Sequence, residues 1–190
     1  MRKYASFFIF FLALPAFAVN SDLYATGGLG KADVTVGDGF LNDGARGFSE
    51  TAVGYNLAAG IRVNQYFGLE AGVYNAGSGV ESLFERDSVE FENKYLVGTA
   101  RLDFDNDLFV ALKAGQMNWR AMADGHYYTG DGRARRHDSS EMFIAVLGLT
   151  LNKRFALDVN HLIVDIADDF DIKITSVNFT YSFFSFAWGL

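Results

Sequence analysis

Hydrolytic chemistry would require this chain to hold a histidine close to a hydroxyl and a carboxyl side chain. The segment Gly125-His126-Tyr127-Tyr128-Thr129-Gly130 places a histidine two residues before a hydroxyl group. A serine–histidine–carboxylate hydrolase needs a serine nucleophile and an acid that orients the histidine. Tyr128 occupies the nucleophile position, and no acid at a fixed spacing accompanies His126. His161 likewise has no serine close to it. The sequence therefore predicts no catalytic residue, no enzymatic activity and no cofactor.

Charged side chains gather in glycine-rich stretches. One stretch is basic, and because guanidinium groups bind phosphate oxygens well, its arginines are candidate contacts for lipopolysaccharide phosphates. These are Arg133, Arg135 and Arg136, followed by His137. Two stretches are acidic, with Glu81, Glu85, Asp87, Glu90 and Glu92 in one and Asp165, Asp168, Asp169 and Asp171 in the other. Clustered carboxylates can bind Ca²⁺, but the ligand spacing here is loose, so no metal site is predicted. Ordinary solvated loops are the simpler interpretation.

Five further charges recur close to short polar turns. Leu69-Glu70, Leu112-Lys113 and Leu157-Asp158 each place an ionisable residue after a leucine, at a similar distance past a turn. Arg62 and Arg101 precede turns. If the flanking segments are strands of one closed sheet, all five side chains face inward at similar depth. A charge in a low-dielectric interior is costly unless it is paired, so we expect hydrogen-bonded ion pairs. These five residues form the predicted interior charge network, either as a polar core or, less favoured, as the lining of a narrow conduit.

Short turns and long loops alternate along the chain. The turns are Asn64-Gln65, Asp105-Asn106-Asp107 and Asn152-Lys153-Arg154, each between two runs of alternating polar and apolar residues. The longer polar stretches cover residues 34–50, 77–93, 122–140 and 165–171. Eight strands are predicted, over residues 23–33, 51–63, 66–76, 94–104, 107–119, 141–151, 154–164 and 172–183. This arrangement predicts an all-β fold, an eight-stranded antiparallel transmembrane β-barrel whose short turns face the periplasm.

The chemistry of the two strand faces indicates which side meets lipid. In the last predicted strand the apolar face carries Val177, Phe179, Tyr181 and Phe183, and the other face carries Ser176, Asn178, Thr180 and Ser182. Small polar residues suit the inside of a narrow barrel, whereas a solvated outer face would carry more lysine and glutamate. The apolar face is therefore assigned to lipid, with Phe67, Phe104 and Phe155 as an aromatic girdle beside the turns. Three polar residues fall on the lipid-facing phase and predict a bulge or an exit from the membrane: Gln116, Asn118 and His161.

The first eighteen residues have the pattern of an export signal. Arg2 and Lys3 precede an apolar run at residues 7–17, and Ala16-Phe17-Ala18 fits a cleavage site. Two segments are thus predicted, a signal peptide at 1–18, exported by the Sec pathway, and a barrel domain at 19–190. Without Arg2 and Lys3, the chain keeps 14 basic and 23 acidic side chains, a charge of −9, which argues against nucleic acid as a partner. Cysteine is absent, so disulfides are excluded.

The segment Gly60-Ile61-Arg62-Val63-Asn64-Gln65-Tyr66-Phe67-Gly68-Leu69-Glu70-Ala71-Gly72-Val73-Tyr74 resembles the first periplasmic hairpin of the outer-membrane protein A (OmpA-type) barrel family. Further similarity lies in Leu23-Tyr24-Ala25-Thr26-Gly27-Gly28-Leu29-Gly30, in residues 112–121 and in the aromatic last strand at 177–183. The resemblance implies an eight-stranded barrel with an internal charge network to which Glu70 and Lys113 correspond.

The chain departs from that family at its end. No peptidoglycan-binding domain follows the barrel, so cell-wall anchoring is not expected. The residues after Phe183 continue to alternate, so the last strand ends at either Phe183 or Leu190, and its aromatic residues fit recognition by the barrel-assembly machinery. Lipid A deacylases are barrels of similar size, but fold analogy alone does not establish their chemistry here.

Three functions are consistent with these patterns. The first is a monomeric structural and surface-interaction protein of the Gram-negative outer membrane, in contact with membrane lipids and lipopolysaccharide, acting as an adhesin or receptor. The second is a small diffusion pore, and the third is a lipid-modifying enzyme. Eight strands enclose a space just wide enough for side chains, which favours the first over the second.

Overall fold

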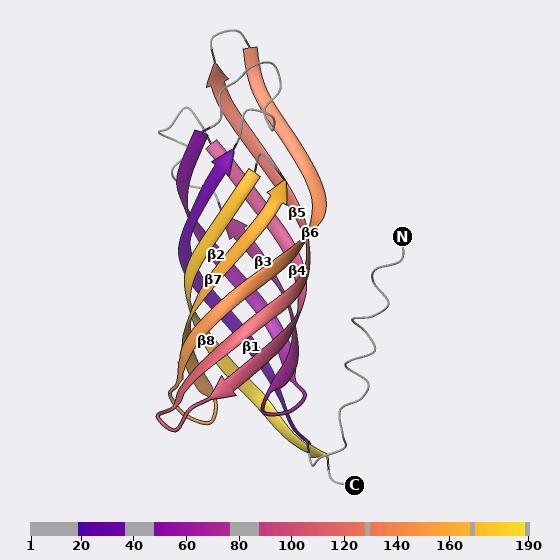
Figure 1. Ribbon diagram of the computed structural model, residues 1–190, viewed down its shortest axis with the longest axis vertical. Coiled ribbons are helices and arrows are strands. Elements are labelled where there is room, and N and C mark those ends of the chain that lie inside the picture. Colours follow the sequence, from indigo (N-terminus) through magenta and orange to yellow (C-terminus); the bar gives the residue numbers. More distant parts are fainter. Residues whose placement is uncertain (1–18, 37–47, 77–87, 128–129, 168–169, 189–190) are drawn as a thin grey trace.

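The chain forms one closed antiparallel β-barrel (Figure 1). This computed structural model describes residues 19–36, 48–76, 88–127, 130–167 and 170–188. The signal peptide predicted at 1–18 lies outside the described residues. The eight strands are β1 (Val19–Val36), β2 (Phe48–Arg62), β3 (Phe67–Ala76), β4 (Ser88–Asp103), β5 (Leu108–Tyr127), β6 (Gly130–Thr150), β7 (Phe155–Ala167) and β8 (Phe170–Trp188). Each strand pairs with its neighbours in sequence order, and β8 pairs with β1, so the sheet has no free edge around the barrel wall.

The three short turns lie where the sequence predicts them. In the first, the Asn64 side-chain oxygen accepts hydrogen bonds from the backbone N–H groups of Tyr66 and Phe67, both at 2.8 Å. In the third, Asn152 accepts in the same way from Arg154 and Phe155. An asparagine side chain that bonds to its own backbone two or three residues on stabilises a tight reversal of the chain.

The middle turn uses a different device. Asp107 adopts a left-handed backbone conformation with φ of 60°, which aspartate tolerates better than most residues. The Phe104 N–H donates to the Leu108 carbonyl at 2.8 Å and closes the turn.

Seven strands are longer than predicted and β3 begins one residue later than predicted, and the long loop predicted at 122–140 is wrong. Residues 122–127 continue β5 and residues 130–140 belong to β6, with Tyr127 paired to Gly130 across the tip. Figure 1 shows this hairpin rising beyond the other strands at the end opposite the short turns. Similarly, most of the loop predicted at 165–171 belongs to β7 and β8. Backbone pairing does not require apolar side chains, so strands continue past the point where lipid contact ends.

The last strand does not end at Phe183, and the alternative end at Leu190 falls on residues outside the described part. The described strand runs to Trp188. The register with β1 shifts between Leu23 and Tyr24, because Leu23 pairs with Phe184 and Tyr24 pairs with Ser182. Phe183 is therefore the extra residue of a β-bulge, and both Phe183 and Phe184 are exposed. The bulge explains why the alternation changes phase at this point.

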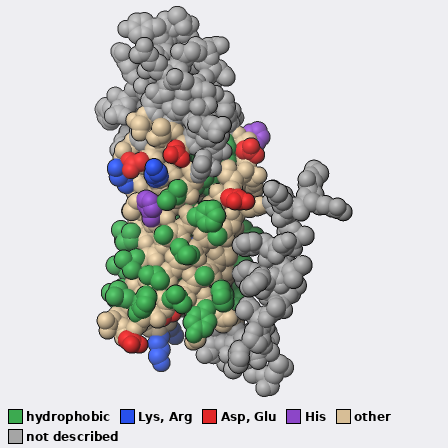
Figure 2. Space-filling model, viewed as in Figure 1, with side chains coloured by type: hydrophobic (Ala, Val, Ile, Leu, Met, Phe, Trp, Pro, Cys, Tyr) green, Lys and Arg blue, Asp and Glu red, His purple; other side chains and the backbone are tan. Residues whose placement is uncertain are grey.

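An apolar belt covers the half of the barrel nearer the short turns, and Figure 2 shows it on one face. Its exposed apolar residues come from all eight strands. It is made of outward side chains that are strongly exposed, such as Leu29 (69%), Leu112 (67%) and Phe143 (61%). Among the described residues, no helix is long and apolar enough to cross a bilayer. Gln116, Asn118 and His161 point outward without a register shift at their own positions, since the shift in β7 lies between Asp165 and Ala167. His161 Nδ1 lies 2.9 Å from Thr175 Oγ1.

On β1 and β8 the polar and apolar faces change places along the strand. On β8, inward Asn178 and Ser176 lie beside outward Phe179 and Val177, but nearer the loops inward Ile174 lies beside outward polar residues. The same change is seen on β1, where outward Leu29 is followed by Lys31 and Asp33 while inward Ala32 and Val34 are fully buried. We call this change the face exchange. On the turn side of it the barrel is apolar outside, and on the loop side it is apolar inside.

Candidate functional site

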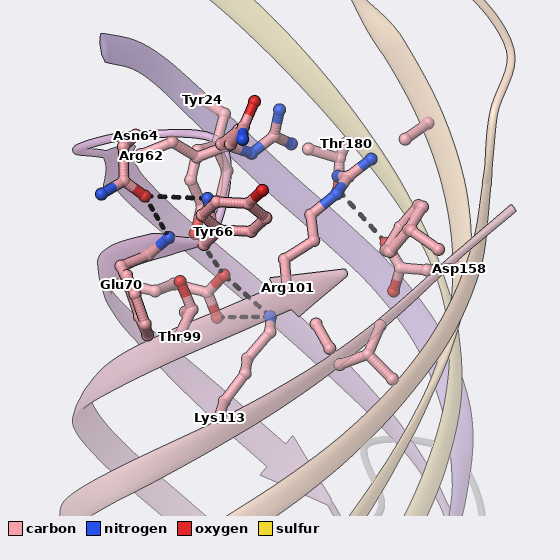
Figure 3. A pocket seen from close by; sticks show the side chains of 16 residues that line it. Tyr24, Arg62, Asn64, Tyr66, Glu70, Thr99, Arg101, Lys113, Asp158 and Thr180 are labelled. Atoms are coloured by element: carbon pink, nitrogen blue, oxygen red, sulfur yellow. Dashed lines mark hydrogen bonds and ion pairs between the residues drawn. The ribbon is translucent and has the colours of Figure 1, made fainter. Parts of the chain in front are cut away.

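A buried ion pair lies at the centre of the polar interior (Figure 3). Lys113 of β5 donates to both carboxylate oxygens of Glu70 on β3, at 2.8 Å each. The hydroxyl groups of Tyr24 and Tyr95 donate to the same carboxylate at 3.0 Å. Glu70 therefore accepts four hydrogen bonds from three strands besides its own, and its side chain is only 1% exposed. A buried carboxylate needs such a set of donors to remain charged.

Asp158 on β7 is held differently from Glu70. Its two oxygens accept hydrogen bonds from Asn178 Nδ2 at 2.9 Å and from Thr180 Oγ1 at 3.3 Å. Thr180 also contacts Thr26 Oγ1 at 2.9 Å, which ties β8 to β1. Within the described residues, no cation lies within ion-pairing distance of Asp158. The expected ion pair is replaced by two neutral donors.

The two arginines of the predicted network pair away from the central charges. Arg62 lies 3.6 Å from Asp22 and over the ring of Tyr24. Arg101 pairs with Asp103, donates to Thr150 Oγ1 at 2.9 Å and lies over the Phe109 ring, 3.6 Å from its centroid. Guanidinium groups stack on aromatic faces in this way at little desolvation cost. Of the five predicted residues, the structure joins Glu70 and Lys113 directly and places the arginines nearer the turns.

A small cavity joins this network to the end of the barrel that carries the short turns. Its volume is about 50 Å³, and it reaches from the first turn, at Asn64 and Tyr66, to Glu70, Lys113 and Asp158 (Figure 3). Since a water molecule needs roughly 10–15 Å³ measured in this way, the cavity has room for a few waters. It is a vestibule on the turn side of the ion pair.

Beyond the ion pair lies a set of neutral polar side chains, which we call the mid-barrel polar set. Its members are Asn56, Tyr74, Asn93, Asn160, Ser176 and Asn178, all at most 4% exposed. Eight of their buried side-chain atoms have no hydrogen-bond partner among the described residues. Leaving such a group dry costs about 1–3 kcal/mol. The eight atoms belong to six side chains, and a dry polar set would therefore cost several kcal/mol, a sizeable part of the roughly 5–15 kcal/mol by which a typical domain is stable.

The loop side of the interior is apolar. We call its packed side chains the apolar collar: Phe91, Met117, Met142, Val164, Ile172 and Ile174, none more than 1% exposed. They come from β4, β5, β6, β7 and β8 and belong to one contiguous buried cluster. Buried apolar clusters in proteins normally pack about as densely as organic crystals, with few voids large enough for a water molecule.

Sequence reasoning missed the partners of the predicted charges. Tyr24 and Tyr95 complete the coordination of Glu70, and Asn178 and Thr180 hold Asp158. All four lie on the inward phase of their strands, so alternation alone would have placed them inside. Which of them reach the same carboxylate depends on the stagger between strands, and the sequence of one chain does not reveal that stagger.

The predicted lipopolysaccharide contacts lie on a strand. Arg133, Arg135 and Arg136 belong to β6, where they pair with Asp124, Met122 and Ala121 of β5. Pairing of β6 with β7 begins only at Phe143, so within the described strands the three arginines belong to a hairpin that is paired on the β5 side. Groups of three or more histidine, aspartate or glutamate side chains able to hold a metal ion do not occur among the described residues.

The family description "Outer membrane protein beta-barrel domain" matches residues 5–183 of the chain. The chain belongs to this family. Outer-membrane barrels of this family place their apolar belt in lipid, so the protein lies in the Gram-negative outer membrane. Comparison with curated protein sequences gave no match.

Solved structures of outer-membrane barrels share the fold. The attachment invasion locus protein Ail of Yersinia pestis is 16% identical over 88% of this chain and 100% of that one, with a TM-score of 0.57. The N-terminal barrel domain of Pseudomonas aeruginosa OprF is 12% identical, with the same coverage of each chain and a TM-score of 0.59. Neisserial surface protein A is 16% identical over 85% of this chain and 97% of that one, with a TM-score of 0.55. At these identities the likeness concerns the fold alone.

Proposed function

We propose that this outer-membrane barrel is a structural and surface-interaction protein, without catalytic activity, that acts as an adhesin or receptor. The observation that carries the proposal is the filled interior, where the ion pair, the mid-barrel polar set and the apolar collar follow one another along the axis. A barrel filled in this way is not suited to carry solutes through its centre. Its contacts with other molecules are then made by its outer surface and its loop end.

The β5–β6 hairpin is the part of the loop end that best suits an interaction role. It extends past the apolar belt (Figure 1), and among the described residues β6 pairs only with β5 from Gly130 to Met142. Arg133, Arg135 and Arg136 follow one another closely on that strand, and arginine is well matched to phosphate groups. The partner we propose for them is the phosphate groups of lipopolysaccharide in the outer leaflet. Crystals of Ail have been obtained with the heparin analogue sucrose octasulfate, a polyanion.

An enzymatic role is not favoured by the described histidine environments. His161 contacts Thr175 on the outer face and has no carboxylate partner in the described part of the chain. We further propose that the protein is exported by the Sec pathway, recognised by the barrel-assembly machinery through its aromatic last strand, and monomeric in the membrane.

The hairpin proposal is tested with a variant in which Arg133, Arg135 and Arg136 are replaced by alanine. We expect its affinity for purified lipopolysaccharide to fall by roughly tenfold or more, because each charge-assisted hydrogen bond contributes about 1.5–3 kcal/mol. A matched control replaces the exposed Lys31 and Lys173 of β1 and β8 by alanine. Equal affinity of the arginine variant and the wild-type protein would refute the assignment of the partner.

The broader proposal is tested in cells. Strains that lack the tip of the β5–β6 hairpin are compared with wild type for adhesion to host cells and for sensitivity of the envelope to detergents. We expect a loss of adhesion or of envelope resistance with normal amounts of barrel in the membrane. Unchanged adhesion and resistance in the hairpin deletion and in the full deletion would contradict a surface role.

A further inference from the structure

Two different features inside the barrel are able to stop a permeating ion. One is the Glu70–Lys113 ion pair, which lies at the inner end of the vestibule, away from the short turns. The other is the apolar collar, which lies on the loop side of the mid-barrel polar set. Between them are the eight buried polar atoms without a full hydrogen bond among the described residues. The state of this middle compartment, wet or dry, decides which feature is the barrier.

We propose that water from the periplasm fills the barrel as far as the mid-barrel polar set, and that the apolar collar, not the ion pair, is the permeability barrier. The mid-barrel polar set is then a binding site for a cluster of water molecules. The inference concerns the inside of the barrel and does not depend on which partner the surface binds.

The hydrogen-bond inventory of the polar set supports bound water. Within the described strands, Asn56 has both amide atoms, Asn93 its Nδ2 and Asn178 its Oδ1 without a partner at hydrogen-bonding geometry. The Tyr74 hydroxyl group interacts with the Asn160 and Ser176 side chains, but none of these contacts has the geometry of a full hydrogen bond. These groups offer donors and acceptors in nearly equal number and carry no net charge, which suits water better than an anion or a cation. Buried waters typically make about three hydrogen bonds each to groups that would otherwise be unsatisfied.

A polar route connects this set to the vestibule. Asn178, a member of the set, donates to Asp158, and Asp158 lines the cavity that opens beside the first turn. Thr180 continues the same inward row of β8 towards the short turns and lines the cavity as well. Water exchanging along this row passes beside the ion pair and does not require it to open.

The face exchange supports the position of the barrier. On β8 the inward row changes from Ser176 to Ile174 and Ile172, at the level where the outer face changes from Val177 to Thr175. On the loop side of this level the barrel is built like a soluble protein, with a packed apolar core. Such a core excludes water and ions, because placing them among apolar side chains leaves their hydration unreplaced.

The test measures the access of silver ions, which are about the size of water, to single cysteines. The chain has no cysteine of its own, so each variant carries one thiol. Ser176→Cys reports on the polar set, Ile172→Cys on the collar four residues further along the same inward row, and Ser182→Cys on the vestibule end. Folded protein in detergent micelles is exposed to Ag⁺, and the remaining thiol is counted with a maleimide after unfolding. Far-UV circular dichroism verifies that each variant is folded.

We expect Ser176→Cys to react within about tenfold of the rate of Ser182→Cys, and Ile172→Cys to react at least roughly a hundredfold more slowly, since only the last lies in a dry core. Asn178→Cys and Met142→Cys repeat the comparison if either first variant does not fold. Protection of both Ser176→Cys and Ile172→Cys would show a dry polar set, and rapid reaction of both would show that the collar is no barrier. Either result overturns the proposal.

The role of the ion pair is separated by repeating the Ser176→Cys measurement in a Glu70→Gln/Lys113→Met background. We expect the rate to change by less than about threefold, because the water route bypasses the pair. An increase of roughly a hundredfold on removal of the pair would make the pair the barrier and overturn the proposal. That result would leave the proposed surface role unaffected, since the barrel of the wild-type protein would still be closed.

Discussion

Breaking the Glu70–Lys113 pair is expected to destabilise the barrel strongly. In Lys113→Met the Glu70 carboxylate keeps the two tyrosine donors but loses both 2.8 Å bonds from the ammonium group. Removing one partner of a buried ion pair costs about 3–5 kcal/mol, because the other charge is left uncompensated. The cavity beside the pair brings water to one side of it, so we expect the lower end of this range, about 3 kcal/mol.

The double variant Glu70→Gln/Lys113→Met tests the physical reason. It leaves no buried charge at this position, so its stability should return to within about 1 kcal/mol of wild type. The assay is equilibrium unfolding in urea of protein reconstituted in lipid vesicles, followed by tryptophan fluorescence. Midpoints are compared only where the slopes agree. If the losses of stability in Glu70→Gln and Lys113→Met simply add up in the double variant, the two residues are not coupled and the reasoning is refuted.

Three further substitutions test other parts of the fold. Gly28→Ala should lower the free energy of unfolding by about 1–3 kcal/mol, because a Cβ there would lie 2.5 Å from the Val177 carbonyl oxygen. The control Gly27→Ala, whose Cβ would have no atom nearer than 3.6 Å, should be nearly neutral in the same urea assay. Leu112→Arg on the apolar belt should cost about 2–4 kcal/mol in vesicles, and an unchanged midpoint would place that face outside lipid. Asn152→Ala removes the acceptor of two backbone N–H groups in an exposed turn and should lower stability by about 1 kcal/mol, measured against a lysine-to-alanine change at Lys153.

The sequence predicts well what depends on local chemistry. The turns at Asn64 and Asn152 are found because asparagine supports a tight reversal and because alternation stops on both sides of it. The inward position of Glu70, Lys113 and Asp158 follows from alternation within the apolar belt, where the contrast between faces is strong. These inferences require only a few neighbouring residues.

The sequence predicts poorly what depends on the stagger of the strands. Arg62 was expected to join the central charges, but it meets Asp22 of the neighbouring strand near the turns. Asp158 was expected to find a cation, but it finds Asn178 and Thr180. Each of these contacts joins residues on different strands, and the axial offset between strands decides which of several inward residues meet.

The face exchange explains why the loops at 122–140 and 165–171 were predicted and why these residues are largely strand. Segments with a polar outward face are predicted as loops from the sequence, because every strand is expected to carry apolar residues on its outward, lipid-facing side. On the loop side of the belt the outer face meets water, and the same alternation serves an apolar interior, as Met142 and Ile172 show. The chain thus combines a membrane barrel and a soluble barrel on continuous strands. In the membrane part the interior can be filled by polar side chains, because the apolar belt on the outside makes the lipid contacts. The part on the loop side requires a packed core, and in our proposals that core closes the barrel at the end whose surface meets other molecules.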